Sequence, residues 1–109
     1  MSSYLIQVSY TVESVASLIK NPQNRTDAVR KSIKKLGGKL VGFWLAFGDS
    51  DVVVIVDMPD NVSAAAMALA VAGSGTAKSV KTTPLLSIDE GVAALKKAAN
   101  SGYKPVGAK

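Results

Sequence analysis

The first segment of the chain alternates hydrophobic and polar residues with a period of two. Between Tyr4 and Thr11 large apolar side chains fall on every second position, and mostly polar residues fall between them. This alternation is typical of a β-strand that buries one face. The side chains predicted to share the buried face are Tyr4, Ile6, Val8 and Tyr10.

Two later segments are hydrophobic at almost every position. Residues 39–47 and 52–58 are separated by Gly48-Asp49-Ser50-Asp51, a run of residues that favours a tight turn, and together they predict a β-hairpin. In the first of these strands, regular alternation would place two sets of side chains on opposite faces. These sets are Val41, Phe43, Leu45 and Phe47 on one face, and Leu40, Gly42, Trp44 and Ala46 on the other.

Three segments before residue 74 have helical patterns. One or two helical turns are expected within 11–20, and a longer helix over 24–36 is expected to end at Gly37-Gly38. The Ala-rich segment 62–72 is apolar almost all round, which indicates a helix enclosed on more than one side.

The last part of the chain predicts an edge strand, a helix and a tail. Residues 76–87 are more polar and contain Pro84, which cannot donate a ladder hydrogen bond and therefore favours a sheet edge. Ser87 and Glu90 have the spacing of a capping box in front of a helix over 89–99. The residues expected to face inward from that helix are Val92, Leu95 and Ala99.

This order of elements predicts an α+β, ferredoxin-like fold: a βαββαβ antiparallel sheet with its helices on one face, followed by an extra C-terminal helix. The first and third strands of that topology are central. The helices cover only one side of the sheet, so the other side of 43–47 and 52–56 would expose a larger apolar patch than a soluble monomer usually does. We therefore predict a homodimer, in which two sheets pack face to face as a dimeric α/β barrel.

Composition limits the chemistry that the chain can perform. Its 109 residues suffice for one domain, predicted over 1–99, with a flexible C-terminal tail over 100–109. The chain has no cysteine and no histidine, which excludes disulfides, thiolate nucleophiles and most zinc, haem and catalytic-triad chemistry. We therefore expect no cofactor and no metal. No leader-like segment begins the chain and no apolar run approaches the roughly 20 residues of a membrane span, so the expectation is a cytoplasmic protein with no membrane partner.

The net charge of +5 arises largely from one segment, which holds seven of the 13 basic residues. These are Lys20, Arg25, Arg30, Lys31, Lys34, Lys35 and Lys39. No aromatic residue interleaves this cluster to stack on bases, which disfavours nucleic acid as a partner. The pattern favours a solvated helix surface, and an acidic partner of a regulatory or assembly module is the alternative.

The hairpin and its surroundings resemble the GYD domain family. The resemblance rests on Gly37-Gly38-Lys39-Leu40-Val41-Gly42-Phe43-Trp44 and on Phe47-Gly48-Asp49-Ser50-Asp51-Val52-Val53-Val54-Ile55, and it extends over about 4–99. Gly48 and Asp51 match the glycine and aspartate of the turn that gives the family its name, whereas Ser50 occupies the tyrosine position. The resemblance implies a ferredoxin-like fold related to the dimeric α/β barrels, and it implies no particular reaction.

Aromatic residues and one carboxylate form the candidate ligand-binding set. Aromatic side chains could line a pocket between sheet and helices, or they could simply form core and dimer interface. Asp57, late in an apolar strand, marks either the solvent end of the strand or a partly buried carboxylate. The candidate set is Tyr4, Tyr10, Phe43, Trp44 and Asp57.

Three functions stay open at this point. The first is a homo-oligomeric α/β-barrel protein that binds a small hydrophobic ligand between sheet and helices. The second is a cofactor-independent oxygenase or isomerase that acts on a small aromatic substrate. The third is a regulatory or assembly module that binds an acidic partner. Two carboxylates in Gly48-Asp49-Ser50-Asp51 could bind a cation, but an ordinary hairpin turn is the favoured interpretation.

Overall fold

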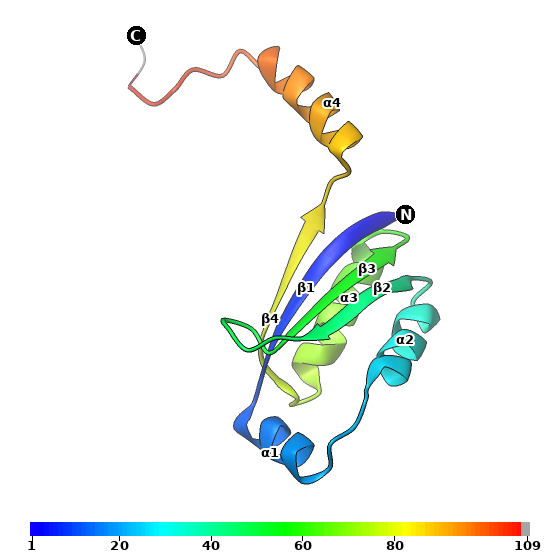
Figure 1. Cartoon of the computed structure of the whole chain (residues 1–109). Helices are drawn as coiled ribbons and strands as arrows, with labels where there is room; N and C mark the ends of the chain where they lie inside the picture. Colours follow the sequence, from blue (N-terminus) through cyan, green and yellow to red (C-terminus); the bar gives the residue numbers. More distant parts are fainter. Residues whose placement is uncertain (108–109) are drawn as a thin grey trace.

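Four antiparallel strands form one sheet in the order β2-β3-β1-β4 (Figure 1). The computed structural model describes residues 1–107. The strands are β1 (Ser2–Tyr10), β2 (Lys39–Leu45), β3 (Val52–Met58) and β4 (Ala77–Leu85). The first and third strands are central, as the sequence predicts.

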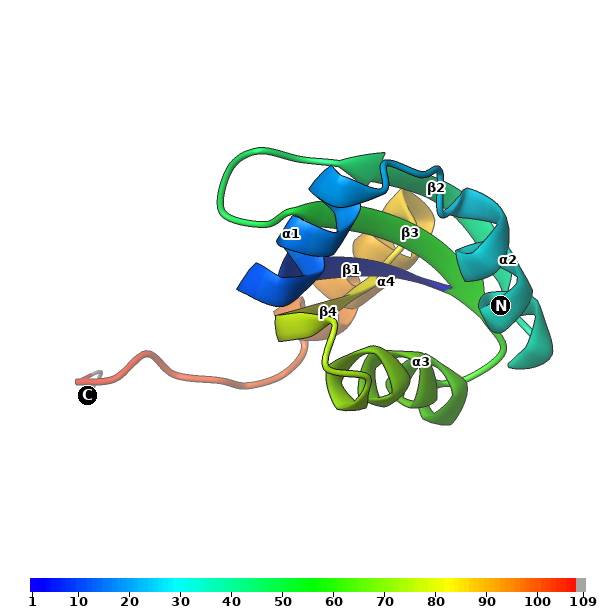
Figure 2. The same cartoon turned by 90° about the horizontal axis from the view of Figure 1, so that it is seen from below.

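Helices α2 (Thr26–Lys35) and α3 (Asn61–Gly73) cover the same face of the sheet (Figure 2). Helix α1 (Val12–Lys20) follows β1 at one end of the sheet, and α4 (Ile88–Ala99) extends from the opposite end of β4, so the chain measures 61 × 32 × 21 Å (Figure 1). The arrangement is the predicted ferredoxin-like fold with an extra C-terminal helix. The predicted tail has no helix or strand over 100–107, and its last two residues, 108 and 109, lie outside the described residues.

The core lies between the central strands and the two covering helices. Alternate residues of β1 and β3 point into it, which confirms the predicted inward set of β1: Tyr4, Ile6 and Val8 are buried, and the half-buried Tyr10 packs against the core. Each fully buried aliphatic side chain of this kind contributes about 1.5–3 kcal/mol relative to exposure. The core consists of Tyr4, Ile6, Val8, Ile33, Val52, Val54, Val56, Met58, Ala64 and Met67.

The helix ends that the sequence predicts are confirmed by their capping contacts. Gly37 adopts a φ of 83° directly after α2, a conformation that costs glycine little. The backbone N–H of Ser63 donates to Asp60 at the start of α3. Ser87 and Glu90 form both hydrogen bonds of a capping box, and the Ser87 N–H that donates to the Glu90 carboxylate lowers the pKa of Glu90.

The predicted faces of β2 are partly wrong because the strand contains a β-bulge. Leu40 pairs with Val56 and Gly42 pairs with Ile55, so Val41 is an extra residue with no partner of its own. Leu40 therefore shares the helix-covered face with Phe43, although regular alternation would separate them. Beyond the bulge, Gly42 and Trp44 lie together on the opposite face, as predicted.

Two helices are less covered than their sequences suggest. Helix α3 buries Ala64 and Met67, but its outer side leaves Val62 and Leu69 exposed, so it is not enclosed on several sides. Helix α4 buries none of its residues, and Leu95, predicted to face inward, is 71% exposed. Within one chain α4 extends beyond the sheet instead of folding back onto it (Figure 1).

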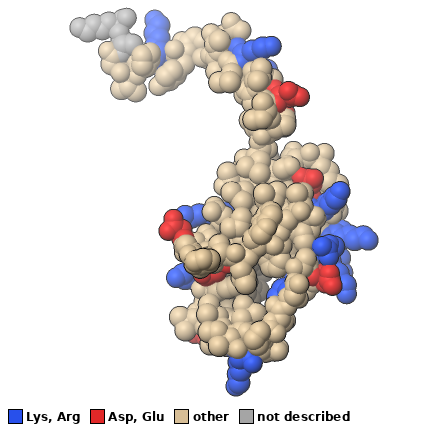
Figure 3. Space-filling model, viewed as in Figure 1, with Lys and Arg blue, Asp and Glu red and all other residues tan. Residues whose placement is uncertain are grey.

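The side of the sheet opposite α2 and α3 has no helix on it, and we call it the open face. The paired residues on this side include a central apolar group from β1, β2 and β3, with polar residues such as Ser3, Gln7 and Asp57 beside it. Figure 3 looks onto it and shows charged groups mainly around its edges. Its larger apolar side chains are Leu5, Trp44, Val53, Ile55 and Leu85.

Candidate functional site

A cavity of about 300 Å³ lies between the sheet and helices α2 and α3, and it is partly open to solvent. Its floor is the helix-covered face of the sheet, and its walls come from the facing sides of the two helices. Ligand pockets in proteins typically have volumes of about 300–1,000 Å³ and mostly apolar walls. The lining residues are Ile6, Val8, Tyr10, Arg25, Ala28, Val29, Ser32, Ile33, Phe43, Val52, Val54, Met67, Ala70, Val71, Ser74 and Thr76.

Small side chains keep this cavity open. Ala28 and Ser32 are four residues apart on α2, so they lie on the same side of the helix and face the gap. Ala70 and Ser74 have the same spacing at the end of α3 and line the opposite wall. Because neither helix presents a long side chain at these positions, the two helices leave the gap between them unfilled.

The cavity continues outward into a cleft beside the connection between α1 and α2. Three residues, Tyr10, Phe43 and Arg25, line both spaces and so mark the mouth where they meet. The outer cleft has a volume of about 680 Å³. Its other lining residues are Leu18, Pro22, Gln23, Asn24, Thr26 and Leu45.

The chain positions Arg25 at this mouth through the start of α2. The side chain of Asn24 accepts hydrogen bonds from the Thr26 N–H at 3.0 Å and from the Thr26 hydroxyl at 2.6 Å. This local turn sets the first residue of the helix, and Arg25 lies immediately before it. Within residues 1–107 the ion pair formed by the basic cluster is Arg30 with Asp27, and Arg25 takes no part in it.

Tyr10 lies close enough to Arg25 for the guanidinium charge to act on the Tyr10 hydroxyl. Burial raises the pKa of the Tyr10 hydroxyl; the charge of Arg25 acts in the opposite direction and that of Asp51 in the same direction as burial. Asp51 Oδ2 also accepts a hydrogen bond from the Tyr10 N–H at 2.7 Å, which ties the hairpin loop to the end of β1. The Tyr10 side chain is therefore a neutral hydroxyl near pH 7.

The structure divides the candidate ligand-binding set into three places. Tyr10 and Phe43 line the cavity, as the pocket hypothesis requires. Tyr4 lies deeper, in the core, where its hydroxyl donates to Asn61 Oδ1 at 2.5 Å, and it does not line the cavity.

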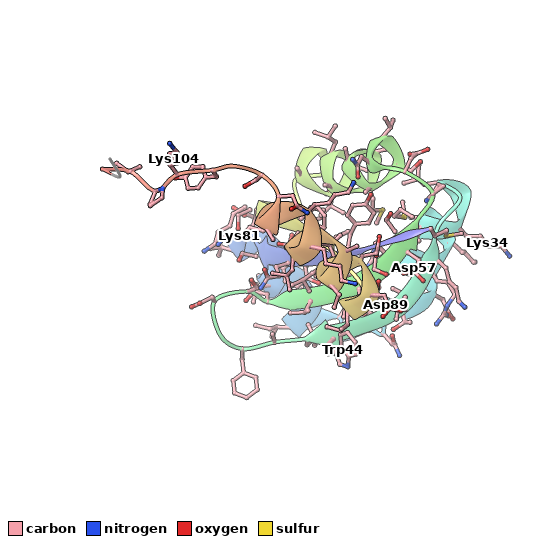
Figure 4. The ribbon with its side chains drawn as sticks, turned by 90° about the horizontal axis from the view of Figure 1, so that it is seen from above. Lys34, Trp44, Asp57, Lys81, Asp89 and Lys104 are labelled. Carbon is pink, nitrogen blue, oxygen red and sulfur yellow. The ribbon has the colours of Figure 1, made fainter. Side chains whose placement is uncertain are left out.

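Trp44 and Asp57 lie on the open face, so Trp44 does not line a pocket between sheet and helices together with Tyr10 and Phe43. Both alternate out of the core: Trp44 pairs with Val53, and Asp57 pairs with Ser3. Figure 4 shows Trp44 pointing away from the side of the sheet that carries α3. Asp57 accepts a hydrogen bond from the Ser3 hydroxyl at 2.6 Å, which gives this half-buried carboxylate a structural partner.

Arg25 is the residue of the mouth that the candidate set lacks. In the sequence, Arg25 is one of the residues of the basic cluster. It differs from the others in its position, directly before α2 at the end of the α1–α2 connection. Arg25 is exposed, as are the other basic residues of the cluster, and blue groups gather along the α2 side of the molecule in Figure 3.

Gly48-Asp49-Ser50-Asp51 lies in the hairpin connection, but this connection spans 46–51 and is longer than the predicted tight turn. Strand β2 ends at Leu45, so Phe47, predicted within the strand, lies in the connection and is fully exposed. The Asp51 N–H donates to the Val8 carbonyl at 2.9 Å, and the Ser9 hydroxyl donates to the Asp49 carbonyl at 3.3 Å. Across residues 1–107, no three His, Cys, Asp or Glu side chains gather in a way that could hold a metal ion. No helix within the same range has the length and apolar character needed to cross a membrane.

Comparison with known proteins supports the sequence resemblance. The model of the GYD domain family matches residues 4–95. No curated protein sequence matches the chain. Among solved structures, the chain is similar to an uncharacterized NIPSNAP domain protein from Burkholderia xenovorans, with a TM-score of 0.49 and 16% sequence identity; the match covers 80% of this chain and 94% of that one.

Proposed function

The chain belongs to the GYD domain family, and we propose that it binds a small hydrophobic molecule in the cavity between its sheet and helices α2 and α3. The observation that carries this proposal is an open space with predominantly apolar walls. It lies between the sheet and its covering helices, where hydrophobic core side chains would otherwise be expected. Its volume of about 300 Å³ is about twice that of an engineered apolar cavity that binds benzene. A bicyclic aromatic molecule or a medium-length aliphatic chain is therefore the appropriate size.

The proposal is of binding and not of catalysis. Among the residues that line the cavity, Tyr10 and Arg25 carry the ionisable groups. A neutral hydroxyl and a permanently charged guanidinium do not form an acid and base matched to neutral pH. This chemistry supports a ligand-binding role over the oxygenase or isomerase alternative. The alternative of an acidic partner is supported only by the exposed basic side chains of α2. An ordinary solvated helix surface has the same feature.

We further propose that the protein acts as a homodimer, with the open face of the sheet packed on a second copy. The open face presents Leu5, Val53 and Ile55 beside Trp44, which is 53% exposed in one chain. The apolar side of α4 provides a second uncovered surface, in which Ile88 is 84% exposed. Burial yields about 25 cal/mol for each Å² of apolar surface, so covering both surfaces in one assembly stabilises it by several kcal/mol.

Filling the cavity is expected to weaken ligand binding. Ala70→Leu adds three carbon atoms to the α3 wall while keeping a residue with high helix propensity. We expect titration calorimetry with neutral 2-naphthamide to show saturable binding to the wild-type protein and affinity at least about ten-fold lower for the variant, since about 1.4 kcal/mol of lost contact is sufficient.

Ala65→Leu is the matched control, because Ala65 is exposed on α3 and does not line the cavity. This variant should bind 2-naphthamide as the wild-type protein does, and circular dichroism should show the same helix content for all three proteins. Undiminished binding to Ala70→Leu, or no binding to the wild-type protein, contradicts the proposed site.

A further inference from the structure

The mouth of the cavity, as the described residues form it, carries positive charge and no negative charge. Among the residues of 1–107 that line the inner cavity or the outer cleft, Arg25 has the only charged side chain, and none is a carboxylate. The neighbouring polar group, the Tyr10 hydroxyl, is a neutral donor near pH 7. A ligand that enters the apolar space therefore passes a cation and a hydroxyl at its entrance.

Arg25 also lacks a carboxylate partner within the described part of the chain. The nearest candidate in sequence, Asp27, pairs with Arg30 at 2.7 Å. Asp51 is close enough to raise the pKa of the Tyr10 hydroxyl, but its Oδ2 accepts a hydrogen bond from the Tyr10 backbone N–H. Arg25 is exposed, so the donors of its unpaired guanidinium are accessible to an anionic oxygen group of a ligand at the mouth.

Resting on the proposed function, we propose that the ligand of this cavity is an amphipathic acid, whose carboxylate binds Arg25 at the mouth while its hydrophobic body occupies the space between sheet and helices. Two observations combine here: apolar walls such as Ile6, Val54 and Met67 inside, and a single cation at the entrance. The guanidinium presents donors in a planar fork that matches the two oxygens of a carboxylate. The Tyr10 hydroxyl supplies a further donor on the same side.

A pair of nearly isosteric probes, 2-naphthoate and 2-naphthamide, separates the contribution of charge from that of the hydrophobic body. By titration calorimetry at pH 7 and low ionic strength, the wild-type protein should bind the carboxylate about ten-fold more tightly than the amide. Arg25→Gln should remove the preference for the charged probe, so that the ratio of the affinities for 2-naphthoate and 2-naphthamide falls from about ten to about one. Added salt should weaken only the binding of 2-naphthoate.

Arg30→Gln is the control for the general positive charge of α2, because Arg30 is on the same helix and does not line the cavity. It should leave the preference for the carboxylate in place. Equal wild-type affinity for both probes, or an equal loss of preference in Arg30→Gln and Arg25→Gln, overturns the inference while the cavity proposal stands. Binding of neither probe to the wild-type protein overturns both.

Discussion

Replacing Ile55 with lysine is expected to convert the proposed homodimer into folded monomers. Ile55 lies at the centre of the open face, where it pairs with Leu5 on one side and Gly42 on the other. An ammonium group in an apolar contact between two sheets costs several kcal/mol unless it finds a partner, so the dissociation constant should rise by at least about a hundred-fold. Within one chain this face lacks a helix, so the monomer should keep its fold.

The measurement is sedimentation velocity over a dilution series of the wild-type protein and the variant. Val62→Lys provides the matched control, since Val62 is an aliphatic residue that is 79% exposed on the outer side of α3, away from the open face. This control should sediment as a dimer. A wild-type monomer, or a dimer that survives Ile55→Lys, contradicts the proposed interface.

The second large effect is expected from Gly38→Ala, which should destabilise the fold. A Cβ at Gly38 would lie 2.7 Å from the Asp57 carbonyl oxygen and 2.2 Å from the Met58 Sδ. Met58 and Ile33, the other neighbour of this position, are fully buried, so they have little room to move. We expect a loss of about 2–3 kcal/mol in the free energy of unfolding and a melting temperature lower by about 10 °C or more.

Chemical denaturation of Gly38→Ala beside Gly48→Ala measures this effect with the same change of residue. A Cβ at Gly48 has no atom within 4 Å, and its φ is not positive, so this control should unfold close to the wild-type midpoint. If both variants unfold at the same denaturant concentration, the requirement for glycine at position 38 does not come from the close packing of β2 and β3 against the end of α2.

The order of the elements was predictable because each strong pattern reflects one local cause. Alternation in β1 predicts its buried face, since that strand pairs on both sides and has a helix layer on only one. The ends of α2 and α4 were predictable from Gly37 and from the Ser87–Glu90 pair, because capping depends on neighbours in sequence.

The residues of the site were only partly predictable from the sequence. Membership of the site depends on which face of the sheet a side chain occupies and on distances between elements, and hydrophobic periodicity specifies neither. Tyr10 and Trp44 are equally plausible pocket residues in the sequence, yet Tyr10 lines the cavity on the helix-covered side, whereas Trp44 pairs with Val53 on the open face. Arg25 appears as one basic residue among seven until the start of α2 positions it at the mouth. The uncovered state of α4 depends on what lies around it, which its amphipathic pattern does not specify.

The bulge in β2 also determines which changes of length this strand tolerates. Val41 is the extra residue, so deleting it would restore regular pairing and leave Leu40, Phe43 and Trp44 on the faces that they occupy now. Deleting Trp44 instead would turn Leu45 to the open face and shift the register of the hairpin loop. Within this strand, the loss of one residue therefore preserves the faces of the others at the bulge and not at Trp44.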